Sequence, residues 1–191
     1  MSGGYKLGVV ALGAATLVAA IAVTFVLAER SSVTVNPAGF VLPRLEGGGS
    51  VSLSQFHGRP LVVNFFASWC PACRTELPEL ASAASKLRGR VSFLEVDSLD
   101  PGNGLAMAHQ YRLEKLSVEL ARDIGGSDKS GLHDALGGGN GMPITAFYSA
   151  DGRLITVHLG AFTENRLRDE LRQLYRANVS SADVSGTNVS G

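Results

Sequence analysis

The distribution of apolar and polar residues along the chain predicts a strand–helix–strand unit near its middle. Residues 61–67 form an almost unbroken apolar run of strand length, which is typical of a strand buried on both faces of a sheet. The next segment has helical spacing and ends near Gly89. Its apolar positions are Leu77, Leu80, Ala81, Ala84 and Leu87. A second strand is predicted at residues 91–97, parallel to the first and joined to it by a right-handed crossover.

Later in the chain, the clearest pattern is a hairpin followed by a closing helix. A turn containing Asp151 and Gly152 joins two β-rich runs, residues 144–148 and 154–159. A helix is predicted at residues 163–177, with Thr163 as its N-cap. Its inward-facing residues are Leu167, Leu171, Leu174 and Tyr175.

Weaker patterns predict three short elements between the crossover and the hairpin. They are a helix at residues 101–113, a strand at residues 117–123 and a helix at residues 130–136. Residues 124–141 are rich in Gly, Asp and Ser, and they show the least regular pattern of the central region.

The N-terminal end has the pattern of a membrane helix. Residues 7–28 carry no charge and would span about 33 Å as a helix, against a hydrocarbon core of roughly 30 Å. Lys6 precedes the stretch, so the positive-inside rule places the rest of the chain outside the cytoplasm. The alternative is a signal peptide cleaved after Ala28, which exports the same domain.

These patterns divide the chain into four parts. Residues 1–30 are predicted to be a membrane anchor or signal peptide, and residues 31–36 a polar tether. Residues 37–177 would form one domain, since a chain of 191 residues with 45% hydrophobic content can hold one sizeable core. Residues 178–191 are predicted to be a disordered tail. The formal net charge of zero offers no electrostatic case for binding nucleic acid.

The two cysteines of the chain, Cys70 and Cys73, lie at the predicted strand-to-helix junction. Residues three apart on one helical turn have Cα atoms roughly 5–5.5 Å apart, inside the range of about 4.4–6.8 Å that a disulfide accepts. The pair could therefore open and close with little backbone movement. Pro71 suits the first helical turn, where its missing N–H is not needed.

The same position predicts different roles for the two sulfurs. The free N–H groups and the dipole of the helix N-terminus favour a thiolate on Cys70, which we expect to be open to solvent. Cys73, one turn further in and less exposed, would resolve a mixed disulfide. A purely structural disulfide is a poor alternative, because a four-residue loop removes little chain entropy. A metal site would need a second ligand pair, and the four histidines (His57, His109, His133 and His158) are scattered, so we interpret them as surface or turn residues.

Residues 69–73, Trp-Cys-Pro-Ala-Cys after an apolar strand, resemble the active site of the thioredoxin superfamily. The longer stretch 64–78 is similar to the membrane-anchored TlpA/ResA/CcmG-type branch, with Arg74, Glu76, Leu77 and Pro78 after the second cysteine. The resemblance extends from about residue 37 to residue 176. It implies an α/β thioredoxin fold, in which a central mixed sheet is flanked by helices and preceded by an N-terminal β-hairpin and one transmembrane helix.

The resemblance also implies an activity and its partners. Proteins of this branch are extracytoplasmic thiol–disulfide oxidoreductases, held in the cell membrane by a single-pass anchor. The expected clients are exported proteins that carry thiols or disulfides, with a membrane thiol protein as electron donor or acceptor. The resemblance favours a reductant acting in cytochrome c biogenesis. It implies no metal and no cofactor beyond a redox-active Cys70–Cys73 disulfide.

Further site residues follow from the resemblance. In thioredoxin-like proteins the proline before the hairpin strand is cis and faces the cysteines; here that residue is Pro143, and the backbone of Met142 would pair with an extended client. A trans proline at a strand start is the alternative that sequence alone would favour. We expect Trp69 to shape the rim around Cys70, and Pro71 and Ala72 to contact the client as well.

Glu76 is the candidate proton acceptor for Cys73, because an acidic residue at this position modulates the thiols in the ResA-like branch. The alternative is a solvated charge on an exposed first helical turn. Asn64 stands where thioredoxin has a buried Asp relay, and Asn cannot titrate. This chain would therefore do without that relay or replace it with Glu76 or water.

Two other functions use the same cysteines. Cys70 and Cys73 could be soft ligands of a Cu(I)-handling module. Related copper chaperones space their cysteines by three and add a distal His, which this sequence does not clearly offer. A peroxiredoxin-type peroxidase would carry Thr-x-x-Cys, whereas residue 67 is Ala.

Overall fold

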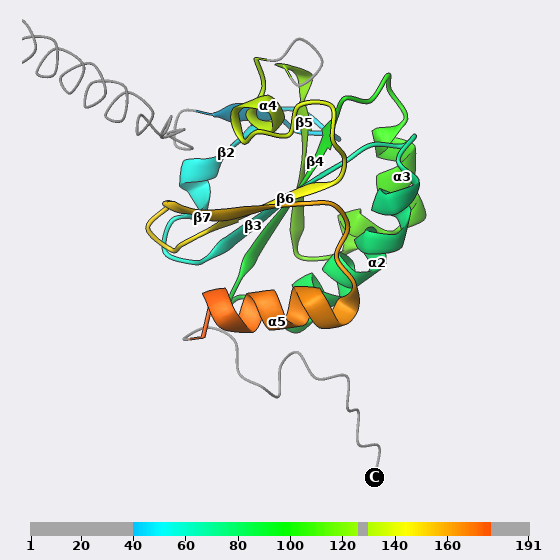
Figure 1. Cartoon of the computed structure of the whole chain (residues 1–191). Coiled ribbons are helices and arrows are strands. Elements are labelled where there is room, and N and C mark those ends of the chain that lie inside the picture. Colours follow the sequence, from blue (N-terminus) through cyan, green and yellow to red (C-terminus); the bar gives the residue numbers. More distant parts are fainter. Residues whose placement is uncertain (1–39, 126–129, 177–191) are drawn as a thin grey trace, which may run out of the picture. The chain divides into compact units, whose positions relative to one another are not determined.

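The computed structural model of the protein describes residues 40–125 and 130–176 (Figure 1). The predicted anchor at residues 7–28, the tether at residues 31–36 and the tail at residues 178–191 lie outside these ranges. Within them, no helix combines the length and the apolar character that a membrane crossing requires.

Five strands form the mixed sheet at the centre of the domain. They are β3 (Leu61–Phe66), β4 (Ser92–Ser98), β5 (Val118–Asp123), β6 (Ile144–Tyr148) and β7 (Leu154–Leu159). Their order across the sheet is β5–β4–β3–β6–β7. β3, β4 and β5 are parallel, whereas β6 is antiparallel to both β3 and β7. The predicted parallel pair and the predicted hairpin are both confirmed.

The two faces of the sheet are covered by different elements (Figure 1). One face packs against α2 (Pro71–Lys86), α3 (Gly104–Gln110) and α5 (Glu164–Leu174). The other packs against the hairpin of β1 (Val41–Pro43) and β2 (Ser50–Ser52), the 3₁₀ turn η2 (Leu53–Phe56) and α4 (Leu132–Ala135). The sheet flanked by helices and the N-terminal hairpin were both expected.

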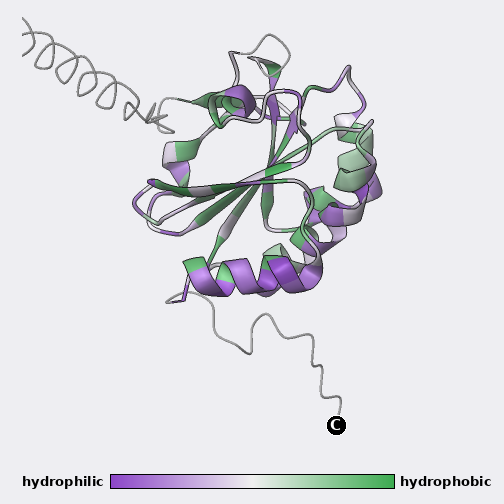
Figure 2. Cartoon of the chain, viewed as in Figure 1, coloured by the Kyte–Doolittle hydropathy of each residue, from purple (hydrophilic) through white to green (hydrophobic). Residues whose placement is uncertain are grey.

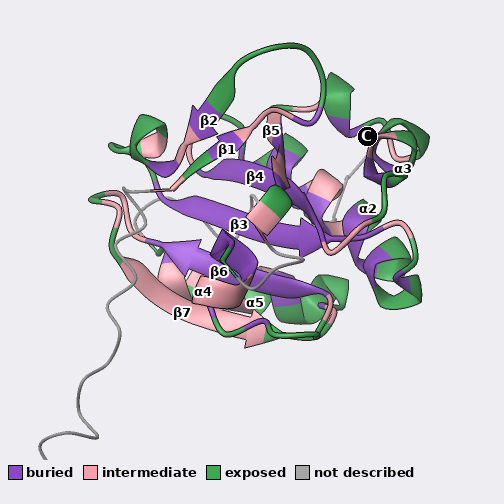
Figure 3. Cartoon of the chain, turned by 90° about the horizontal axis from the view of Figure 1, so that it is seen from above, coloured by how far each residue is buried: buried purple, intermediate pink, exposed green. Residues whose placement is uncertain are grey.

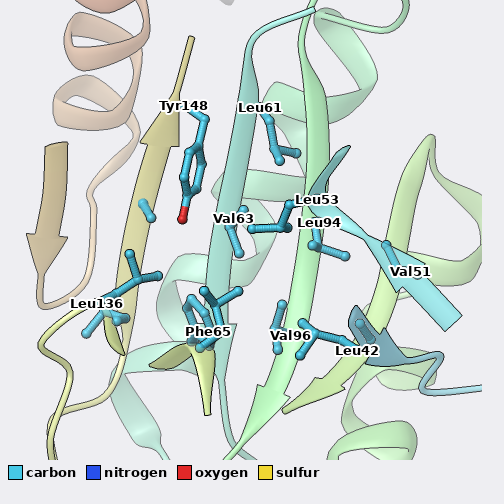
Figure 4. Packing of buried hydrophobic residues seen from close by; sticks show 14 residues of the cluster. Leu42, Val51, Leu53, Leu61, Val63, Phe65, Leu94, Val96, Leu136 and Tyr148 are labelled. Carbon is cyan, nitrogen blue, oxygen red and sulfur yellow. The ribbon is translucent and has the colours of Figure 1, made fainter. Parts of the chain in front are cut away.

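The central strands are buried on both faces, as their unbroken apolar pattern predicts. Every residue of β3 and β4 is buried, whereas the edge strand β7 is only partly covered (Figure 3). Alternate residues of β3 point to opposite faces. Val63 and Phe65 belong to the apolar cluster on the hairpin side, in which Val63 lies beside Leu53 and Leu94 (Figure 4). Val62 and Phe66 face the helices, and Asn64 lies between them on that same side.

The closing helix α5 is amphipathic. Leu167 and Leu171 are buried against the sheet, and hydrophilic residues occupy much of the remaining surface (Figure 2). Its N-cap is Thr163, whose Oγ1 accepts a hydrogen bond from the Arg166 N–H at 3.5 Å, as predicted. Tyr175 is also buried, while Leu174 is only partly so.

Several predicted elements are shorter in the structure. The helix expected at residues 101–113 is α3, which begins at Gly104 and ends at Gln110. Arg112 has a left-handed backbone conformation with φ of 55°, which stops the α-helix, and the 3₁₀ turn η3 (Leu113–Lys115) follows. The helix expected to end near Gly89 ends at Lys86.

Candidate active site

Both cysteines lie where β3 delivers the chain into α2. Cys70 is the N-cap residue, with φ of −88° and ψ of 108°, and Pro71 opens the helix. The backbone N–H of Cys73 donates to Cys70 Sγ at 3.0 Å. An N–H group directed at the sulfur from the first turn of a helix stabilises negative charge there. The predicted thiolate-favouring position is therefore present.

Cys70 and Cys73 are joined in a disulfide, and their Cα atoms are 5.3 Å apart. This separation agrees with the spacing expected for residues three apart on one helical turn. The bond spans a sequence separation of only 3, so it links residues that the helix already holds together.

The predicted difference in exposure between the two cysteines is wrong for this disulfide-bonded form. Cys70 is 2% exposed and Cys73 is 1% exposed. The sulfurs belong to an apolar cluster that also contains Phe66, Leu77 and Met107, which we call the cysteine cluster. Tertiary contacts cause this burial of the cysteines, because Met107 packs into the cluster from α3, a distant part of the chain. The surface beside the buried disulfide is open, since Trp69 is 51% exposed and Pro71 and Ala72 are also exposed.

Trp69 is held in place by the loop that follows β4. Its indole Nε1–H donates to the carbonyl oxygen of Leu99 at 2.8 Å. The neighbouring Ser68 donates from its N–H and its hydroxyl to the Asp100 carboxylate. Burial alone would raise the pKa of Asp100, but these bonds and further backbone N–H groups lower it below its usual value. The rim around Cys70 is therefore a fixed surface.

The peptide bond between Met142 and Pro143 is cis, as the resemblance implied. Pro143 is buried, and its carbonyl oxygen accepts from the Gly160 N–H at 2.9 Å. Met142 is half-buried and packs against the cysteine cluster. Because Ile144 pairs with Phe65 near the end of β3, the cis proline lies at the same sheet edge as the cysteines.

His133 is not a surface or turn residue as predicted, because it is fully buried on α4. Its Nε2 atom lies 2.9 Å from the Gly141 carbonyl oxygen, which can only accept, so Nε2 carries the proton and donates. The ring meets Phe65 edge-on, with centroids 5.4 Å apart. Burial lowers the pKa of His133, so the ring is neutral at neutral pH. His133 therefore ties α4 to the loop that carries Pro143.

Substitution of His133 by Leu should loosen that loop. We expect the free energy of unfolding to fall by about 1–2 kcal/mol, because the Gly141 carbonyl loses its donor and the contact with Phe65 changes. Urea denaturation of the oxidised protein measures the change. The matched control is His57→Leu at an exposed position, which should shift the unfolding midpoint far less. Equal effects of the two variants would contradict an anchoring role for His133.

Glu76 is buried, so the alternative of a solvated charge is wrong. Its carboxylate Oε1 accepts from the Phe162 N–H at 3.2 Å and from Thr145 Oγ1 at 3.4 Å. Oε2 accepts from Asn64 Nδ2 at 3.3 Å. Burial raises the pKa of Glu76 to about 7, and these three hydrogen bonds limit the rise. Cys73 lies one helical turn before Glu76, on the same buried side of α2.

Glu95 is a second buried carboxyl group, which the sequence analysis did not single out. It lies on β4 opposite Asn64 of β3 and is 1% exposed. Burial raises its pKa well above the usual value, and the nearby charge of Glu76 adds to this. The available signal was a Glu in the middle of a strand with apolar neighbours, at residues 91–97.

Fold and site together define a thioredoxin-fold protein with a redox disulfide at the N-terminus of a helix. The chain belongs to the AhpC/TSA family, whose model matches residues 34–152.

Relatives within this group are thiol–disulfide oxidoreductases. The chain is 32% identical over 147 residues to the thiol:disulfide interchange protein DsbE of Pseudomonas fluorescens biotype C, covering 75% of each chain. It is 26% identical over 145 residues to the thiol–disulfide oxidoreductase ResA of Halalkalibacterium halodurans, covering 75% of this chain and 76% of that one. The protein is therefore a thiol–disulfide oxidoreductase of the DsbE/ResA type.

Solved structures share the fold. A secreted disulfide oxidoreductase of Mycobacterium tuberculosis, described as homologous to E. coli DsbE, aligns with a TM-score of 0.56 at 24% identity and covers 74% of this chain and 97% of that one. A thioredoxin-family thiol:disulfide interchange protein from Chlorobium tepidum aligns with a TM-score of 0.56 at 22% identity, covering 71% and 92%. At these identities the two structures support the thioredoxin fold alone.

Proposed function

We propose that this protein is an extracytoplasmic reductase of disulfides in exported proteins, of the kind needed in cytochrome c maturation. The observation that carries the proposal is the arrangement around the Cys70–Cys73 disulfide. A backbone N–H points at Cys70 Sγ, and Glu76 is buried one turn behind Cys73 with a pKa of about 7. A loop with a cis proline lies at the same sheet edge.

The reaction begins with the reduced protein. The Cys70 thiolate attacks one sulfur of the client disulfide, a mixed disulfide forms, and the other client sulfur leaves as a thiolate. The Cys73 N–H stabilises the attacking thiolate in the reduced state. Cys73 then loses its proton to Glu76 and attacks Cys70 Sγ. The Cys70–Cys73 bond closes, the client leaves with two electrons, and the released client thiolates take up protons from Glu76 and water.

Glu76 suits the second step because of its buried setting. A general base works best when its pKa lies near the working pH, and burial brings a carboxylate into that range here. Among the described residues, the donors to the Glu76 carboxylate are Asn64, Thr145 and the Phe162 N–H, and none of them is a lysine or arginine that would hold the carboxylate ionised through an ion pair. It can take a proton from Cys73 and release it after each turnover.

The client would bind across the open surface beside the disulfide. Trp69, Pro71 and Ala72 are exposed on one part of this surface, and Met142 is half-buried on another. Leu159, which pairs with Ile144 at the start of β6, is 63% exposed at the same edge. Apolar side chains around a hydrogen-bonding loop suit an extended, unfolded client segment.

The proposed location outside the cytoplasm rests on the uncharged stretch at residues 7–28. A membrane thiol protein would then return electrons to Cys70–Cys73, because the exterior lacks the reducing pool of the cytosol.

Equilibration with glutathione redox buffers tests the direction of the reaction. Trp69 is the single tryptophan and directly precedes Cys70, so its fluorescence should report the redox state. We expect a reduction potential below about −220 mV and rapid reduction of insulin disulfides. A potential near −120 mV, as in strongly oxidising relatives of thioredoxin, would contradict the proposed reductant role.

The AhpC/TSA match makes a thiol peroxidase the second candidate. Cys70 is paired with Cys73, which could resolve an oxidised Cys70, but residue 67 is Ala where that reaction would have Thr. Consumption of hydrogen peroxide by the reduced protein distinguishes the two activities. Turnover with peroxide that exceeds turnover with insulin would favour the peroxidase.

A further inference from the structure

Three polar residues form a row across the buried, helix-facing side of the sheet. Strand register places Glu95 of β4 beside Asn64 of β3, and Asn64 beside Thr145 of β6. Apolar residues lie on both sides of the row. The cysteine cluster is on one side, and a cluster that contains Val62, Phe93 and Phe147 is on the other. Glu76 of α2 closes over the row by accepting from both Asn64 and Thr145.

Two buried oxygen atoms of these residues lack a hydrogen-bond partner in the described part of the chain. The Asn64 amide nitrogen donates to Glu76 Oε2 at 3.3 Å and to Thr145 Oγ1 at 3.1 Å. Asn64 Oδ1 and Glu95 Oε2 are both buried, and neither has a hydrogen-bond partner in the described part of the chain. An amide oxygen can only accept, and a carboxyl oxygen can donate only when it is protonated. Neutral Glu95 beside Asn64 would satisfy both atoms.

The groups that face Glu95 also favour its neutral form. Its neighbour on β5 is Leu120, and the facing group on α2 is the acidic Glu76. Asp97 follows on the same face of β4, but Arg122 of β5 pairs with it at 3.0 Å. Burial and the charge of Glu76 are what act on Glu95, and both oppose a second negative charge.

We propose that Glu95 is a positioning residue that stays protonated and donates from its carboxyl group to Asn64 Oδ1. This bond fixes the Asn64 amide with its nitrogen toward Glu76, and so keeps the Glu76 carboxylate placed to receive the Cys73 proton. The inference rests on the proposed role of Glu76 in thiol–disulfide exchange. Glu95 neither gains nor loses a proton in the cycle. Glu76 and Glu95 together therefore carry one negative charge before the proton transfer from Cys73 and none after it.

Two substitutions of Glu95 separate hydrogen bonding from charge. Glu95→Gln keeps the shape and offers an N–H to Asn64 Oδ1, so insulin reduction and its pH profile should stay within about twofold of wild type. Glu95→Leu fills the space without a donor, so the Asn64 amide is free to turn. We expect about tenfold slower reduction at neutral pH and a shifted pH profile for the Leu variant. Equal, large changes in both variants would overturn the proposal, because they would mean that Glu95 acts through its charge.

Infrared spectroscopy of the oxidised protein tests the protonation directly, without any client. Above pH 8 the Glu76 carboxylate is ionised, so a buried carboxylic acid band should remain in wild type and in Glu76→Gln but disappear in Glu95→Gln. If the spectra of wild type and Glu95→Gln do not differ by such a band, the inference about Glu95 is overturned. The proposed oxidoreductase function is unaffected by that outcome. Failure of the proposed function would appear separately, as a wild-type protein that does not reduce insulin.

Discussion

Replacement of Cys70 by Ser should abolish the reduction of client disulfides, with a loss of at least about 10³-fold in rate. The serine keeps the N-cap position and can still accept the Cys73 N–H, so the helix and its stability should change little. What disappears is the sulfur that attacks the client. Reduction of insulin by the dithiol-reduced protein is the measurement. Full activity of the Cys70→Ser variant would show that another group makes the attack.

The matched variant Cys73→Ser should give a different failure. Its Cys70 can still attack, but the serine cannot displace the client, so a mixed disulfide accumulates. Mass spectrometry and non-reducing electrophoresis would detect this adduct at one client per protein. The contrast between an inactive protein and a trapped one identifies which sulfur is the nucleophile. An adduct in the Cys70→Ser variant instead would reverse the assignment, which matters because both sulfurs are similarly buried in the disulfide form.

The regular part of the fold could be predicted because its local signals agree with its tertiary role. Strands β6 and β7 have the predicted bounds, since both are β-rich runs that end at a strong turn signal. Thr163 caps α5 because its side-chain oxygen accepts a backbone N–H of the first turn, and this local interaction also makes Thr a preferred N-cap in isolated peptides. The cis proline at residue 143 came from the resemblance alone, because a proline before a strand is otherwise ambiguous.

The burial of Glu76 could have been read from helical spacing. Cys73, Glu76, Leu77 and Leu80 follow the i, i+3, i+4, i+7 pattern of the buried stripe of α2. An acidic residue on that stripe is a buried acid, although acids are also common in exposed first turns. Two explanations therefore competed at this position, and the spacing was the more reliable one.

Other features of the site depend on contacts that sequence spacing does not report. Glu95 lies in a strand buried on both faces, so alternation does not tell which neighbours it meets. His133 lies in the Gly-rich segment at residues 124–141, whose weak pattern predicts a short helix but not which of its faces is buried. The cover over Cys70 includes Met107 from α3, and this contact joins segments that only the folded sheet brings together.

Glu76→Gln should make the oxidised protein more stable at neutral and alkaline pH while making it a poorer reductase. The Glu76 pKa rises from 4.5 to about 7 on folding. Between these values the unfolded chain releases the proton and the folded protein keeps it, so the wild type loses stability as the pH rises. At about 1.4 kcal/mol per pH unit the loss reaches about 3 kcal/mol by pH 7 and then stays constant. Gln does not titrate, so the variant avoids this loss.

Urea denaturation of both oxidised proteins between pH 4 and pH 8 measures the effect. The difference in the free energy of unfolding should grow in favour of Glu76→Gln across this range, and Glu79→Gln, a half-exposed position on the same helix, should show no such growth. Reduction of insulin by Glu76→Gln should be about 10–100-fold slower at pH 7, because Cys73 has lost its proton acceptor. Parallel stability curves for the variant and wild type would show that folding leaves the Glu76 pKa unchanged, and the buried base would then have no tuned pKa. If Glu76→Gln raises the free energy of unfolding and lowers the rate of insulin reduction, then Glu76 serves the reaction and not the stability of the fold.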